Sequence, residues 1–130
     1  MAFLRTLLTA CCALLMLVSG ADAQPARDLF GAVHTPTTGT QAPIGGYARG
    51  CLAGAVQLPT DGPGWQAMRL SRDRRWGTPE LINYVASLAQ SVQQDGWPGI
   101  LVGDMGAARG GPMKSGHASH QIGLDVDIWF

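Results

Sequence analysis

One segment of the chain, Pro79 to about Gln94, has the sequence of an amphipathic helix, and it constrains the fold more than any other segment. Thr78 is a good N-cap, proline suits the first helical position, and the Glu80 carboxylate complements the positive end of the helix dipole. Leucine and valine recur with the helical period, at Leu81, Val85, Leu88 and Val92. The pattern predicts a helix with one buried face, ended by an Asp-Gly pair.

The other periodic segments are short and strand-like. Trp65 to Leu70 predicts a short strand, and Ile100 to Val102 predicts a buried strand that stops at a glycine. From Leu124 to Ile128, apolar residues alternate with Asp125 and Asp127, which predicts a strand with one apolar and one acidic face. Periodicity therefore gives one helix and two or three strands, and it does not give a topology.

Composition and charge limit the classes of partner. The chain has 130 residues, 46% of them hydrophobic and 14% charged, which indicates at most one ordinary globular domain. Nine lysines and arginines balance nine acidic residues, so no net positive field attracts nucleic acid or an anionic membrane. Four arginines gather between residues 69 and 75, but Asp73 interrupts them, and we interpret them as a solvated face: Arg69, Arg72, Arg74 and Arg75.

Residues 1–23 have the pattern of a secretory signal. An arginine at position 5 precedes an uncharged apolar run that is shorter than the about 20 residues of a membrane-spanning helix. Ala21-Asp22-Ala23 then offers small residues at the two positions that a signal peptidase reads. The alternatives are a retained membrane anchor and a buried core helix. We expect an exported protein with no stable membrane anchor after cleavage, an extended arm over residues 24–46, and a domain over residues 47–130.

Cys51 is the one cysteine that remains after removal of the signal. An odd cysteine in an oxidising compartment indicates either a buried, inert thiol or a disulfide whose partner lies outside these 130 residues. The sequence leaves both interpretations open.

Histidines and aspartates gather between His117 and Asp127. On a continuous helix His120 and Asp127 would be about 10 Å apart along the axis, too far for one ion, but Gly123 breaks the segment between them. In a strand, Asp125 and Asp127 would share a side about 6–7 Å apart, where a bound cation offsets their repulsion.

The cluster therefore predicts Asp127 as a metal ligand and Asp125 as a group that orients a neighbouring residue. The plainer alternative is an exposed acidic edge beside solvated loop histidines, with His117 hydrogen-bonded to backbone. A serine hydrolase using Ser119 is disfavoured, because the loop has no G-x-S-x-G sequence.

Two long stretches carry a family resemblance. GDMGAARGGPMKSGHASHQIGLDVDIWF and IGGYARGCLAGAVQLPTDGPGWQAMRLSRDRRWGTPELINYV resemble the penicillin-insensitive murein endopeptidases, which are exported zinc peptidases of Gram-negative bacteria. Their wider group includes lysostaphin-type enzymes, D-Ala-D-Ala metallopeptidases and the hedgehog signalling domain. The resemblance implies an α+β fold, a small, mainly antiparallel sheet with flanking helices, with which the helix and strands above agree.

The resemblance also implies roles for individual residues. His120 and Asp127 would be the first two zinc ligands, His117 an additional active-site histidine, and Cys51 one half of a disulfide. The third ligand and the catalytic histidine would come from a downstream H-x-H motif, which this sequence does not contain. We therefore expect these 130 residues to be the amino-terminal part of a longer catalytic domain, and to be inactive or nearly so alone.

The activity that the resemblance implies is hydrolysis of cross-links between peptidoglycan stem peptides in the periplasm, chiefly the D-alanyl to meso-diaminopimelyl bond. The alternative is a non-catalytic exported module that binds peptidoglycan or a partner protein.

Overall fold

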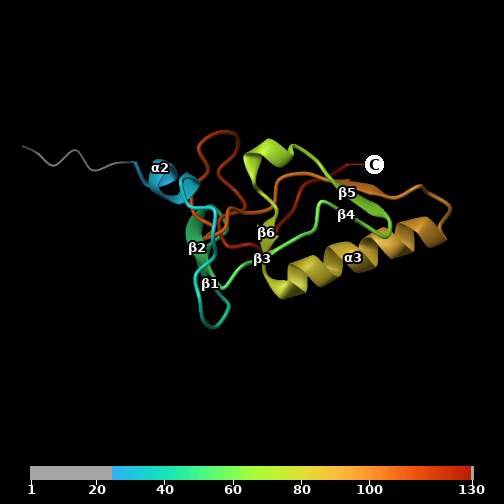
Figure 1. Ribbon diagram of the computed structural model, residues 1–130, viewed down its shortest axis with the longest axis horizontal. Coiled ribbons are helices and arrows are strands. Elements are labelled where there is room, and N and C mark those ends of the chain that lie inside the picture. The colour runs from blue at the N-terminus through green and yellow to red at the C-terminus, as the bar shows by residue number, and fades with distance from the viewer. Residues whose placement is uncertain (1–24, 130) are drawn as a thin grey trace, which may run out of the picture.

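The computed structural model describes residues 25–129 and shows an α+β fold, which confirms the fold class implied by the resemblance (Figure 1). The predicted signal, residues 1–23, lies outside the described residues, as does Phe130. A short helix α2 (Ala26–Gly31) and the hairpin of β1 (Ala42–Gly46) and β2 (Arg49–Ala53) form one end of the molecule. The long helix α3 (Pro79–Gln94) runs along the opposite end.

The largest sheet has four short strands in the order β4-β5-β7-β8. These are β4 (Asp61–Gly62), β5 (Trp65–Ala67), β7 (Ile100–Val102) and β8 (Ile128–Trp129). Strands β5 and β7 are parallel, because the chain crosses through α3 between them, and the other two pairs are antiparallel. A second small antiparallel pair joins β3 (Val56–Gln57) to β6 (Trp76–Gly77).

Helix α3 has the bounds that the sequence predicts. The Thr78 hydroxyl accepts a hydrogen bond from the Leu81 backbone N–H at 3.2 Å, so the N-cap is made as expected. One face of the helix packs against β7 and completes the main core. The buried members of that core are Leu58, Leu81, Val85, Ala89, Val92, Ile100, Val102 and Met105.

Thr78→Ala is expected to destabilise the protein by about 1 kcal/mol, because it removes the cap from a buried helix end. The measurement is the free energy of unfolding in urea. Thr78→Ser is the matched control, since it keeps the accepting oxygen, and it should recover most of the loss. Equal destabilisation by alanine and serine would contradict a capping role.

Two strand predictions are too long. The strand expected over residues 65–70 ends at Ala67, and the chain turns into the short 3-10 helix η1 (Leu70–Arg72) between Arg69 and Asp73, both with positive φ. The strand expected from Leu124 is regular only at Ile128–Trp129. The physical reason is a tight loop. The Asp125 carboxylate accepts a hydrogen bond from the His120 backbone N–H, and the backbone around Asp125 therefore cannot continue as a straight strand.

The segment over residues 24–46, expected as an extended arm, is partly structured. It contains the six residues of α2 and the whole of strand β1, which pairs with β2 over its full length. Within residues 25–129, no helix is both long and apolar enough to cross a membrane.

Candidate metal centre

The loop over residues 107–127 contains no helix or strand and carries the predicted site residues. Hydrogen bonds from Gln121 fasten it to the β1–β2 hairpin: its side-chain amide donates to the Ala48 carbonyl at 2.9 Å and accepts from Gly50 N–H at 3.1 Å. The backbone of Gly111 also donates to the Gln121 carbonyl at 3.0 Å. The loop is therefore anchored on both sides of its exposed middle.

His120 is the most buried of the site histidines, with 3% of its side chain exposed. Its backbone has φ 65°, a conformation that costs free energy for a residue other than glycine. Asp125 stabilises this conformation, because its Oδ2 accepts a hydrogen bond from the His120 backbone N–H at 3.1 Å. The same Oδ2 lies 2.8 Å from His120 Nδ1, although not in line for a good hydrogen bond.

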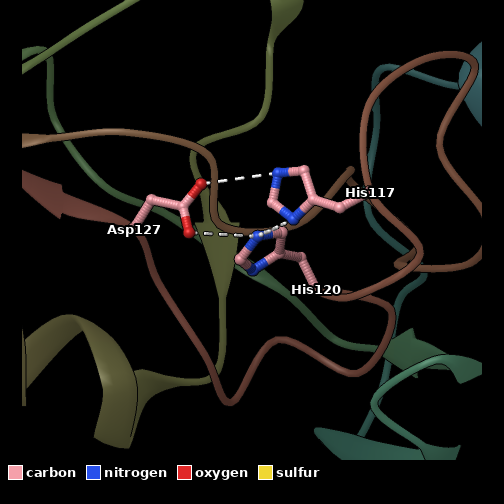
Figure 2. A group of neighbouring side chains, drawn as sticks. All are labelled: His117, His120 and Asp127. Carbon is pink, nitrogen blue, oxygen red and sulfur yellow. Dashed lines mark hydrogen bonds and ion pairs between the residues drawn. The ribbon is translucent and has the colours of Figure 1, made fainter.

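Three side chains converge on one point, as Figure 2 shows. His120 Nε2 lies 3.5 Å from Asp127 Oδ1 and 3.1 Å from His117 Nδ1, and His117 Nε2 lies 3.4 Å from Asp127 Oδ2. One potential ligand atom from each residue falls within 4.8 Å of the others. A tetrahedral zinc ion with bonds of about 2.0–2.2 Å places neighbouring ligand atoms about 3.3–3.6 Å apart. The 3.5 Å between His120 Nε2 and Asp127 Oδ1 has this spacing, and imidazole nitrogen with carboxylate oxygen is a donor set that zinc accepts.

The structure thus brings together the residues that the sequence singled out. Asp125 and Asp127 do not share one face of a strand; they lie at opposite nitrogens of the His120 imidazole. Asp127 also lies against Gly103. A Cβ added at residue 103 would be 2.9 Å from the Cβ of Asp127, so glycine leaves room for the Asp127 side chain here. The roles of His120 and Asp127 as ligands, of Asp125 in orienting them and of His117 in catalysis stay predictions.

Asp104 is a residue of this site that the sequence analysis missed. It is 1% exposed, its Oδ2 accepts hydrogen bonds from Arg72 and Arg74 at 2.8 Å, and it lies 4.0 Å from His117 Nε2. Burial acts to raise the pKa of this carboxyl, but the hydrogen bonds and charges of Arg74 and Arg72 outweigh it and hold the pKa below its usual value. An aspartate two residues after a buried strand, in a chain with an arginine cluster, was the available signal.

The interpretation of the arginine cluster as a solvated face is wrong for Arg74, which is only 9% exposed. The physical reason is the buried carboxylate of Asp104, which pairs with it. The Arg75 guanidinium donates to the Leu58 carbonyl, and the Arg69 guanidinium lies 4.6 Å from the centre of the Trp129 ring. These three arginines therefore each contact a different partner within the fold.

Two other candidates from the sequence have a place in the structure. The Ser119 hydroxyl lies 2.7 Å from His117 Nδ1, so the serine and histidine that the sequence places two residues apart are in contact. Cys51 is a half-buried free thiol in β2, opposite Ile44 of β1, and has no disulfide partner among residues 25–129. The disulfide stays a prediction.

The fold and the converging donors define a small α+β domain with a candidate divalent-metal centre. Residues 43–130 match the sequence model of the penicillin-insensitive murein endopeptidases. The chain belongs to this family, which confirms the resemblance seen in its sequence.

Relatives named penicillin-insensitive murein endopeptidase come from several bacteria. The chain is 47% identical to that of Haemophilus influenzae over 91 residues, which are 70% of this chain and 32% of the relative. It is 45% identical to that of Yersinia enterocolitica over 94 residues (72% and 34%) and 42% identical to that of Klebsiella pneumoniae over 97 residues (75% and 35%). The chain spans about a third of the length of these curated relatives.

Proposed function

We propose that this chain is part of a zinc-dependent endopeptidase that cleaves the D-alanyl to meso-diaminopimelyl cross-links of peptidoglycan in the periplasm. Two things support the substrate and reaction: membership of the family and the names of relatives up to 47% identical. The main observation in favour of a bound metal is that His120 Nε2 lies 3.5 Å from Asp127 Oδ1, although the two residues are seven apart in an irregular loop.

His120 and Asp127 would hold the zinc ion. The Asp125 carboxylate beside His120 Nδ1 favours a proton on that nitrogen, which leaves the lone pair of Nε2 directed at the ion. The hydrogen bond of the His120 backbone to Asp125, and those of the Asp127 backbone to Gly103 and Asp104, hold the backbone of the two ligands in place without a metal. A preformed site needs little reorganisation on binding.

When bound, zinc lowers the pKa of a water molecule and polarises the scissile carbonyl group. His117 is placed to handle the proton, because its imidazole is 43% exposed and lies beside both proposed ligands. Asp127 Oδ2 and the Ser119 hydroxyl lie at the two nitrogens of this ring and orient it. Since no serine is acylated in this mechanism, drugs that trap a serine nucleophile would not inhibit it.

A further ligand is expected from outside these residues. If His117 handles a proton, His120 and Asp127 provide two ligands, whereas catalytic zinc sites have three protein ligands and a water. We therefore expect the 130-residue chain alone to bind zinc weakly and to show little or no turnover.

Removal of the metal from the complete gene product is expected to abolish cleavage of cross-linked muropeptides, and stoichiometric zinc should restore it. Released fragments are measured by chromatography and mass spectrometry. Serine-reactive phosphonates serve as the control and should leave turnover unchanged, despite the contact of Ser119 with His117. Turnover that survives chelation but not the phosphonate would favour a serine hydrolase. Binding of peptidoglycan without cleavage under any condition would favour the non-catalytic module.

A further inference from the structure

The loop that carries His117 is poorly held by its own backbone. From residue 112 to residue 119, the backbone makes no hydrogen bond to another backbone group in the part of the chain that the structure describes. His117 itself is too exposed to be fixed by packing. Its place beside His120 and Asp127 therefore depends on side chains that reach this segment from outside it.

Two side chains hold this segment near His117. Gln121 Nε2, from the same loop, donates to the Ala118 carbonyl at 2.9 Å, and Arg74 reaches the segment from the folded core. Its Nη2 donates to the Ser115 carbonyl at 2.8 Å and to the Ser115 hydroxyl at 3.2 Å, two residues before His117. Its Nη1 donates to Asp104 Oδ2 at 2.8 Å. The planar guanidinium thus connects a buried carboxylate to an exposed loop, which a single ammonium group cannot do with the same geometry.

The anchor of this connection is shared with the metal centre. The Asp104 carbonyl accepts a hydrogen bond from the Asp127 backbone N–H at 3.0 Å, and Met105 N–H donates to the Arg74 carbonyl at 2.9 Å. Arg74 therefore spans between the backbone that holds Asp127 and the loop that holds His117. A shift of this arginine would change the distance between the two.

We infer that Arg74 is a positioning residue that sets the place of His117 opposite Asp127 by tying Ser115 to Asp104. The role of His117 in this inference rests on the proposed function, whereas the hydrogen bonds between Arg74 and Ser115 do not depend on it. Arg72 offers a built-in comparison, because it donates to the same Asp104 oxygen at 2.8 Å and makes no hydrogen bond to the loop in the described structure.

The test compares Arg74→Lys with Arg72→Lys in the complete gene product. Both variants keep the positive charge beside Asp104, but only the first loses the fork that holds Ser115. Trypsin reports on the loop directly, because the exposed Lys114 precedes Ser115. Losing a charge-assisted hydrogen bond favours local opening, so cleavage after Lys114 should be at least about tenfold faster in Arg74→Lys than in Arg72→Lys.

The second readout is catalytic. Arg74→Lys should lower kcat while KM and bound zinc stay near those of the unaltered protein, and Arg72→Lys should change kcat little. Equal rates of cleavage after Lys114 in the two variants would overturn the tie. Faster cleavage with unchanged kcat would overturn the positioning of His117, whereas failure of the proposed function would appear as absent turnover in the unaltered protein. If Arg74→Lys does not fold, Ser115→Ala, which removes one accepting oxygen, should accelerate the same cut to a smaller extent.

Discussion

Replacing His120 or Asp127 with alanine in the complete gene product is expected to lower kcat/KM for cross-linked muropeptides by at least about 10³-fold, because several kcal/mol of transition-state stabilisation disappear with the metal. Each variant should also lose bound zinc in equilibrium dialysis. The physical basis is the 3.5 Å approach of His120 Nε2 to Asp127 Oδ1, the two groups proposed to hold the ion.

Matched controls separate this loss from the removal of any histidine or aspartate. His34 is an exposed histidine outside the donor group, and Asp61 is an exposed aspartate outside it. His34→Ala and Asp61→Ala should keep both zinc and turnover. Full zinc content in the His120→Ala or Asp127→Ala variant, or activity within tenfold of the unaltered protein, would contradict the assigned ligands.

Local rules were sufficient for helix α3 and strand β7. The N-cap at Thr78 and the apolar stripe of the helix both act within a few residues of sequence, and both are present in the structure. The bounds of β5 and β8 were harder to predict from the sequence. Left-handed backbone at Arg69 and Asp73 follows the end of β5, and the hydrogen bond of Asp125 to His120 delays the start of β8. Such conformations depend on contacts made after the chain has folded.

The site shows the same division. His120 and Asp127 were found because the break at Gly123 lets residues seven apart return to one point. Asp104 was missed because its partners Arg72 and Arg74 lie about thirty positions earlier in the chain, and no periodicity connects them. The parallel pairing of β5 with β7 brings those two segments side by side. Local sequence pattern was therefore enough to find His120 and Asp127, whereas Asp104 could be found only once the pairing of distant strands was known.

Asp104→Asn is expected to destabilise the protein by about 3–5 kcal/mol at neutral pH, because it leaves the buried Arg74 guanidinium without its countercharge. The measurement is the free energy of unfolding in urea at several pH values. Since removing both partners of a buried pair costs less than removing one, the double variant Asp104→Asn with Arg74→Met should be more stable than Asp104→Asn alone.

The pH dependence gives this prediction its sign. Arg74 and Arg72 hold the pKa of Asp104 below its usual value against the opposing effect of burial, so the unfolded chain takes up this proton at a higher pH than the folded protein does. The stabilisation by the carboxylate is therefore complete above the pKa of the unfolded state, about 3.9, and is lost as the pH falls through the lower pKa of the folded state. The difference in stability between the unaltered protein and Asp104→Asn should be constant from about pH 7 to pH 5 and should shrink below about pH 4. A difference that grows on acidification would mean that the folded state binds this proton more tightly than the unfolded chain, and the arginine pair would then not be what stabilises the charge.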